Sequence, residues 1–206
     1  MTGLAGLGAA VPFGVGNALW AFDQPVPGAA THTIVAFYAG TSARIIAGAS
    51  LSLIACVPLV LFGSGVRAIL VEHEDRDLLA NSAFGGVLIL VAAGLGAETI
   101  NMAGALRANH GQLTPGLATA VFEISYVLGF NAAGVGVAIL LLAVAAVALR
   151  EQALMSRQVA LLLLLAGLAF LTPLARFLLG PSVLLLAVVS VRLLRAPAAD
   201  TASIAV

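Results

Sequence analysis

The longest stretch without a charged residue lies between Glu123 and Arg150 and reads ISYVLGFNAAGVGVAILLLAVAAVAL (residues 124–149). An α-helix rises about 1.5 Å per residue, so about 20 apolar residues cross a hydrocarbon core roughly 30 Å thick. The stretch exceeds this length, and it predicts a transmembrane helix over residues 122–149.

Further apolar stretches bounded by charged residues continue this pattern along the whole chain. The last one, from Gln158 to Val191, is too long for one ordinary span, and helix breakers at 172–173 and 180–181 flank Arg176. We interpret it as a tight helical hairpin, with a five-span chain as the alternative. The sequence thus predicts an all-α polytopic transmembrane helix bundle that forms a single integral membrane domain (1–206). About six spans are expected, at residues 2–22, 45–66, 79–106, 122–149, 158–174 and 177–195.

The composition agrees with a lipid environment, because 62% of the 206 residues are hydrophobic and only 9% are charged. A soluble domain carries a charge on about a quarter of its residues. The net charge is zero and lysine is absent, so the chain has no electrostatic footprint for nucleic acid. The single cysteine, Cys56, excludes an internal disulfide. We expect the lipid bilayer as partner, and the sequence leaves a protein partner or a homo-oligomer open.

The arginines indicate an orientation, because cytoplasmic segments carry more positive charge than external ones. With six spans and both ends inside, the inner segments hold the larger set of arginines: Arg67, Arg76, Arg150, Arg157, Arg192 and Arg195. The outer segments then hold the smaller set: Arg44, Arg107 and Arg176. Five spans would move two of the inner arginines outside. The use of arginine alone, beside abundant Ala, Gly and Leu, favours a bacterial source and hence the cytoplasmic (inner) membrane.

The first apolar segment also resembles a secretory signal with small residues at 28–30. A signal peptide has a positively charged start, whereas no positive side chain precedes Arg44. We expect the first helix to be retained, and a short leader missing from the start is the alternative.

Aromatic residues mark the expected outer face, because Trp and Tyr prefer the membrane interface. Trp20, Phe22, Phe37, Tyr38 and Tyr126 all fall near it. The segment at residues 31–43 mixes apolar and small polar side chains. It predicts a short interfacial helix on the outer surface that leads directly into the second span.

Four segments together carry a resemblance of pattern that covers nearly the whole chain: ALWAFDQP (18–25), IVAFY (34–38), SYVLGFN (125–131) and LTPLAR (171–176). With these segments the chain resembles small uncharacterised bacterial multi-pass membrane proteins. The resemblance implies a multi-pass membrane fold and no activity, cofactor or catalytic residue.

Glu98 is the main candidate for a polar site inside the bundle, because ionisable groups within a membrane are costly and need a reason. Asn101, three residues later, lies on the same helix face and provides a hydrogen-bonding neighbour. One interpretation makes Glu98 a proton or cation site. The other makes it a structural group that pairs with Arg107 or Arg176, with Asn101 bridging helices.

A second polar group opens the predicted span at 122–149. Glu123, Tyr126 and Phe130 follow a helical spacing of three and four residues, and Asn131 projects about 80° around the helix from Glu123. If Glu98 and Glu123 converge, the outer half of the bundle contains a cavity that also includes Asn101, Tyr126, Asn131 and Arg176. Glu123 at the wet interface is the alternative.

The sequence contains no motif for catalysis or for a bound cofactor. It has no glycine-rich phosphate loop, no His-Glu-x-x-His and no Gly-x-Ser-x-Gly. The acidic run at 72–77 reads as a solvated loop and predicts no metal site. We expect a non-enzymatic protein that binds lipids or partner proteins and has no cofactor. The alternative is a small transporter or proton-coupled carrier that uses Glu98.

Overall fold

The computed structural model describes residues 1–72, 77–151, 154–172, 178, 182, 186 and 187. These residues form helices and no strand, which confirms the predicted all-α class for this part of the chain. The helical elements are α1 (Thr2–Ala18), the 3-10 turn η1 (Ala21–Asp23), α2 (Thr31–Val71), α3 (Leu78–Asn109), α4 (Pro115–Tyr126), the π-helical turn η2 (Val127–Ala132), α5 (Ala133–Arg150) and α6 (Arg157–Phe170).

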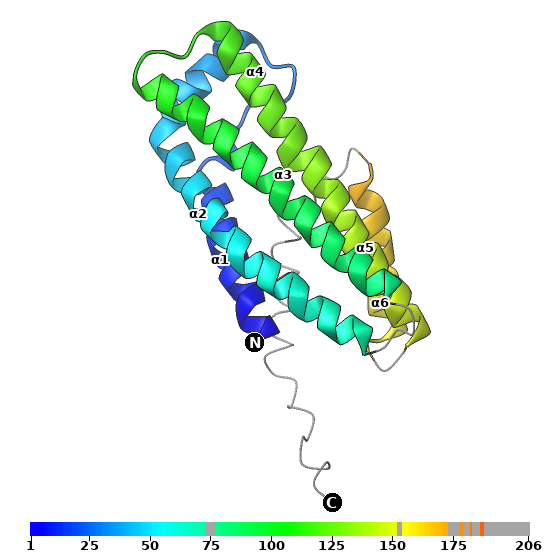
Figure 1. The fold of residues 1–206 in the computed structure, drawn as a ribbon. Coiled ribbons are helices and arrows are strands. Elements are labelled where there is room, and N and C mark those ends of the chain that lie inside the picture. Colours follow the sequence, from blue (N-terminus) through cyan, green and yellow to red (C-terminus); the bar gives the residue numbers. More distant parts are fainter. Residues whose placement is uncertain (73–76, 152–153, 173–177, 179–181, 183–185, 188–206) are drawn as a thin grey trace, which may run out of the picture.

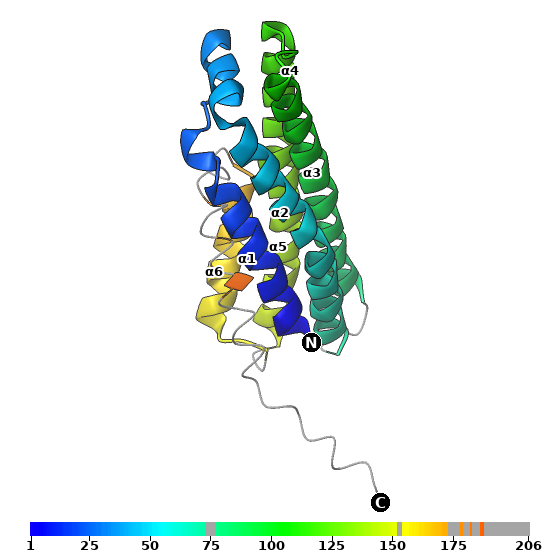
Figure 2. The same ribbon diagram turned by 90° about the vertical axis from the view of Figure 1, so that its left-hand side faces the viewer.

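The long helices pack side by side into an elongated bundle (Figures 1 and 2). Helix α2 packs against α1 and α3, α3 packs against α5, and α5 packs against α6. Elements α4, η2 and α5 follow one another as one rod from Pro115 to Arg150. We call the end formed by α4, the first turns of α2 and the last turns of α3 the upper end. The end where α2 leads to α3 and α5 leads to α6 is the lower end.

Four helical segments in the described part of the chain are long and apolar enough to cross a membrane: Thr2–Asp23, Thr31–Val71, Leu78–Asn109 and Pro115–Arg150. They correspond to the first four predicted spans. The predicted fifth span, 158–174, contains α6, whose 14 residues reach about 21 Å. The predicted sixth span, 177–195, lies outside the described residues except for a few single positions. Six spans therefore stay a prediction.

Glycine contacts show how α1 lies along α2. A methyl group added at Gly16 would lie 2.6 Å from the carbonyl oxygen of Gly48, so the two backbones touch where they cross. Lower down, Gly8 lies against Pro58. Small residues allow this close approach between membrane helices. Helix α1 therefore lies beside the part of α2 that the sequence predicts to span the membrane.

A second glycine crossing joins α3 to α5. A methyl group added at Gly86 would lie 2.6 Å from the carbonyl oxygen of Gly136, and the reverse addition gives the same distance. The two crossings hold α1 to α2 and α3 to α5 through backbone contact, and α2 and α3 pack against each other between them.

The predicted interfacial helix at 31–43 does not form a separate element. These residues are the first turns of α2, which runs unbroken for 41 residues. In Figure 1 they run at an angle to the rest of α2 and lie behind the upper parts of α3 and α4, and α2 packs against both helices. Their apolar side chains Ile34, Phe37 and Tyr38 are buried. Because α4 and the end of α3 supply a protein surface for this apolar face, the segment is part of the core.

Candidate functional site

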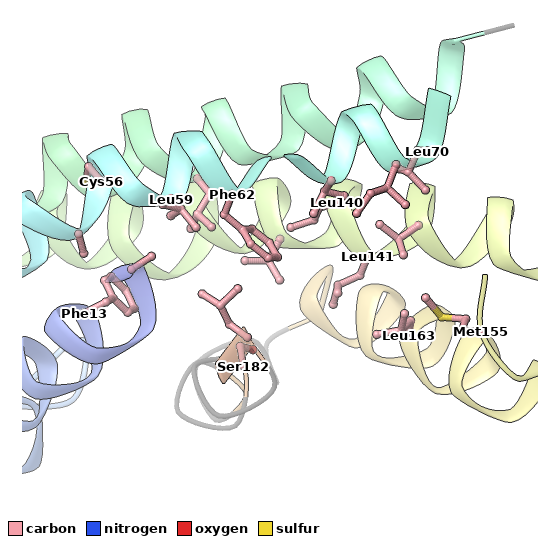
Figure 3. Close-up of a pocket in the computed structure, with 18 of the residues that line it drawn as sticks. Phe13, Cys56, Leu59, Phe62, Leu70, Leu140, Leu141, Met155, Leu163 and Ser182 are labelled. Atoms are coloured by element: carbon pink, nitrogen blue, oxygen red, sulfur yellow. The ribbon is translucent and has the colours of Figure 1, made fainter. Parts of the chain in front are cut away.

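Two hollows among the described residues lie at the level of the predicted spans, one apolar and one polar. The larger, which we call the apolar groove, has a volume of about 260 Å³ and lies among α1, α2, α5 and α6. In Figure 3, Phe13 of α1 stands at one end of it and Leu163 of α6 toward the other. Its lining is almost entirely aliphatic and aromatic, and Ser52, Cys56 and Ser182 are the exceptions.

The groove follows α2 closely. Its lining residues on this helix begin at Ser52 and end at Leu70, which is roughly 27 Å at about 1.5 Å per residue. This length is close to the roughly 30 Å thickness of a bilayer's hydrocarbon core. The apolar groove is therefore about as long as the hydrocarbon layer is thick.

The smaller hollow, which we call the polar cavity, has a volume of about 50 Å³ and lies among α1, α3, α4 and η2. Polar side chains make up half of its lining: Asn17, Trp20, Gln24, Glu98, Asn101 and Ser125. A water molecule needs about 10–15 Å³ of such space. The polar cavity therefore has room for a few water molecules or one small ion with part of its hydration shell.

Glu98 is buried in the polar cavity, with only 7% of its surface exposed. The hydroxyl of Ser52 on α2 lies beside its carboxyl group, but no hydrogen bond joins them. Both Glu98 Oε2 and Ser52 Oγ lack a hydrogen-bond partner among the described residues. Buried polar atoms are seldom left unpaired, so a carboxylate oxygen in this state is a candidate ligand atom.

No arginine in the described part of the chain pairs with Glu98. Arg107 is exposed and lies about 13 Å further along α3. The ion pair at the upper end, 2.7 Å between Arg44 Nη2 and Asp23 Oδ2, is half exposed and involves other residues. Arg176, the other expected partner of Glu98, lies outside the described residues.

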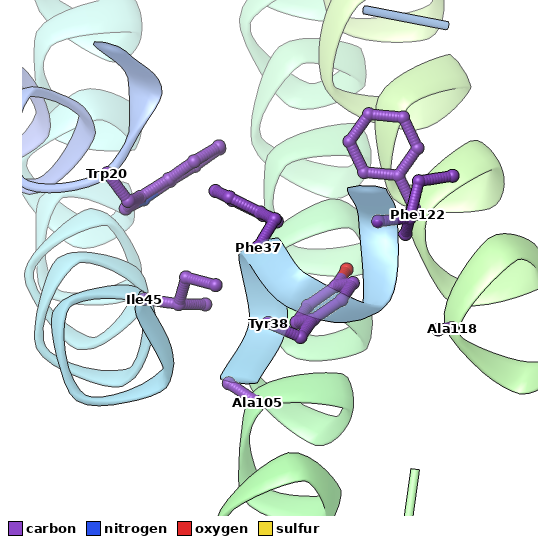
Figure 4. Close-up of a cluster of buried hydrophobic side chains, with 8 residues drawn as sticks. Trp20, Phe37, Tyr38, Ile45, Ala105, Ala118 and Phe122 are labelled. Carbon is purple, nitrogen blue, oxygen red and sulfur yellow. The ribbon is translucent and has the colours of Figure 1, made fainter. Parts of the chain in front are cut away.

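Asn101 is anchored by the bent start of α2. Tyr38, which is 0% exposed, donates a hydrogen bond of 2.7 Å from its hydroxyl to Asn101 Oδ1. Gly104, one turn along α3, leaves room for the ring, because a methyl group there would lie 3.0 Å from Tyr38 Cε1. Figure 4 shows Tyr38 between the first turns of α2 and helix α3. The contact fixes the Asn101 side chain at the wall of the polar cavity.

Tyr38 belongs to the aromatic cluster at the upper end, which we define by Trp20, Phe37, Tyr38 and Phe122. The ring centroids of Phe37 and Tyr38 lie 5.4 Å apart, and those of Phe37 and Phe122 lie 6.5 Å apart, both edge to face. These side chains come from α4, the first turns of α2 and the chain just after α1 (Figure 4). The cluster closes the bundle above the polar cavity.

Trp20 reaches from this cluster to the polar cavity. Its side chain is 6% exposed, and its indole Nε1 has no hydrogen-bond partner within the ranges the structure describes. The ring lies over Gly48, where a methyl group would be 2.7 Å from Cδ1. An indole N–H only donates, so a ligand or water that meets it must present an acceptor.

Two other lining residues offer oxygen atoms. Asn17 donates from Nδ2 to the carbonyl oxygen of Phe13, and this leaves its Oδ1 free to accept. Ser125 donates from its hydroxyl to the carbonyl oxygen of Phe122, and its lone pairs remain. Together with Glu98, these two residues supply one carboxylate and two neutral oxygen atoms that can bind a cation.

Glu98 and Glu123 do not converge, and Glu123 is exposed, which agrees with the alternative that keeps it out of the cavity. Ser125 faces the polar cavity, and Glu123, two residues earlier and about 200° around the helix, is exposed on the opposite side. Asn131 is also exposed, since it lies in the π-helical turn, which shifts the phase of the helix. Tyr126 is half-buried and stacks on Phe130 at 4.5 Å.

Sequence reasoning did not assign Asn17, Trp20, Gln24, Ser52 and Ser125 to this site. A signal existed for two of them, because Asn17 and Trp20 are three residues apart near the end of an apolar segment, where helical spacing gives a shared face. Ser52 and Ser125 carry no such signal. Across the described residues, no group of three or more His, Cys, Asp or Glu side chains is placed to hold a metal ion.

No protein-family model, curated protein or solved structure matches this chain. The likeness to uncharacterised bacterial membrane proteins stays a prediction.

Proposed function

We propose that this chain is a non-enzymatic integral membrane protein that binds the acyl chain of a membrane lipid in the apolar groove. The observation that carries this proposal is the groove itself, whose apolar lining follows α2 from Ser52 to Leu70 at the level of the predicted second span. Apolar hollows with few polar groups are the usual form of sites for apolar ligands. An acyl chain is the apolar ligand that a bilayer supplies in excess.

The position of the groove supports the same occupant. The groove is lined by α1 at one end and by α6 toward the other, with Ser182 and Leu186 also in its lining, and both helices carry exposed leucines, such as Leu4 and Leu165. In a bilayer these exposed leucines would face the lipid next to the groove. In this proposal the protein lies in the cytoplasmic membrane of a bacterium, with both termini on the cytoplasmic side and the upper end outside, as the arginine distribution favours.

The test fills the groove with a larger side chain. Leu59, half-buried in the groove lining, is changed to Trp, and the control is Leu61→Trp on the exposed side of α2. Each protein is expressed in cells fed a photoreactive fatty acid, and lipid cross-links are mapped by mass spectrometry. Wild type and Leu61→Trp should cross-link at groove residues, and Leu59→Trp should lose about nine-tenths of that signal. Equal groove labelling in both variants would contradict lipid binding there.

A second candidate function is a small carrier that uses Glu98. The observation that favours it is the buried Glu98 carboxyl group, which lines a polar cavity and has one oxygen without a partner in the described structure. A group of this kind can bind and release a proton or a small ion.

Glu98→Gln tests this candidate in liposomes, because the amide keeps the shape of the side chain and removes its charge. Flux of protons or of alkali cations should fall to the level of empty liposomes. The control Glu123→Gln removes an exposed carboxyl group and should leave flux unchanged. Flux that survives Glu98→Gln would remove Glu98 from the mechanism.

A further inference from the structure

We infer that the polar cavity is a binding site for a small, partly hydrated monovalent cation, with Glu98, Asn17 and Ser125 supplying oxygen ligands. The inference gives the second candidate function a ligand class and rests on it only for the claim of transport. Binding at equilibrium stands on the cavity alone.

The charge of Glu98 favours a cation as the ligand. Glu98 is the charged residue that lines the polar cavity, and it is more than nine-tenths buried. No arginine among the described residues offsets its charge. An ionised carboxyl group buried without a counter-charge is strongly disfavoured, whereas a bound cation would remove that penalty. One carboxylate matches one positive charge.

The oxygen atoms of the lining side chains also favour a cation. Carboxylate, amide and hydroxyl oxygens are the ligands that hard cations prefer. The polar cavity is lined by Glu98, whose Oε2 has no partner in the described structure, by Asn17, whose Nδ2 is used by its backbone bond and whose Oδ1 can accept, and by Ser125, whose oxygen keeps its lone pairs. Divalent cations bind with several carboxylates, which this cavity does not have.

Trp20 lies at the border of the same cavity. The indole ring lines the cavity, and its Nε1 lies toward Gly48 of α2, so the ring borders the site without ligating the cation. The cavity volume of about 50 Å³ admits an ion with a few such waters and excludes a larger organic cation. A hydrated ion in the cavity would therefore lie beside the Glu98 carboxyl group, whose Oε2 has no partner in the described structure, and beside the Trp20 ring, which reports on it.

The experiment reads the site through Trp20, which is the single tryptophan of the chain. Purified protein in nanodiscs is titrated with sodium chloride at constant ionic strength, with N-methylglucamine chloride as the replacement salt. We expect a saturable change in tryptophan emission. Glu98→Gln should lose the response, and Glu123→Gln should keep it. The variant Glu98→Asp retains the charge and should respond with at least tenfold weaker affinity, which provides a second readout if the Gln variant does not fold.

The outcomes separate the site from the carrier. No sodium response in wild type, or an equal response in the Glu98→Gln variant, would overturn the cation site. An emission change with pH and none with sodium would overturn it as well, because Glu98 would then hold a proton alone. A Glu98-dependent sodium response without flux in liposomes would support the site and remove the carrier function.

Discussion

At the residue scale, the molecule concentrates its buried polar atoms in one region near the upper end. Tyr38 and Asn101 form a hydrogen bond between the first turns of α2 and helix α3, and Glu98, one turn earlier on α3, has an oxygen without a partner in the described structure. The sequence predicted Glu98 and Asn101 as neighbours, because three residues along a helix return to the same face. It did not predict Tyr38, whose contact depends on the bend of α2 and on the space at Gly104.

Tyr38→Phe tests the importance of this contact. The change removes the hydroxyl that donates to Asn101 Oδ1 and leaves a buried acceptor without its donor. We expect the free energy of unfolding to fall by about 1–3 kcal/mol. The control is Tyr126→Phe, because Tyr126 is half-buried and its ring stacks on Phe130 with or without the hydroxyl. Unfolding in mixed detergent, followed by circular dichroism, measures both, and equal stability of the two variants would show that the hydrogen bond contributes little.

At the element scale, glycine crossings determine how closely the helices approach. The Gly16–Gly48 crossing brings α1 against α2 and places the Trp20 ring directly over the α2 backbone. Small residues allow such close packing of membrane helices, but their positions in the sequence do not identify the partner helix. Many glycines lie in the spanning helices. Only the folded structure shows that α1 crosses α2 at Gly48 and that α3 crosses α5 at Gly136.

Gly48→Ala should therefore destabilise the bundle. Its added methyl group would lie 2.7 Å from Trp20 Cδ1 and against the backbone of α1, so the crossing must open. The expected loss is about 1–3 kcal/mol of unfolding free energy. Gly40→Ala on the same helix meets nothing within 4 Å and should be neutral or stabilising by up to about 1 kcal/mol. A Gly48→Ala protein as stable as Gly40→Ala in thermal unfolding would contradict the close crossing.

At the scale of the whole molecule, apolar length and charge spacing predicted the first four spanning segments, because the thickness of the bilayer determines both. The mixture of apolar and small polar side chains at 31–43 was misleading, because a protein surface from α3 and α4 lies where a lipid surface was expected. Helical spacing left two positions open for Glu123, because the direction of a side chain depends on the rotation of its helix within the bundle, and the structure agrees with the exposed alternative. The two hollows arise from packing between helices that are far apart in sequence. Helical spacing indicated Glu98 and Asn101 of the polar cavity, whereas no local pattern indicated the apolar groove.

The measurement that tests the central claim most directly is native mass spectrometry of the protein released from its own membrane in mild detergent. We expect the wild-type protein to carry one retained lipid. The Leu61→Trp protein should carry the same lipid, and the Leu59→Trp protein should have lost it. Protein that is bare in all three cases, or an adduct that Leu59→Trp retains in full, would contradict a lipid in the apolar groove.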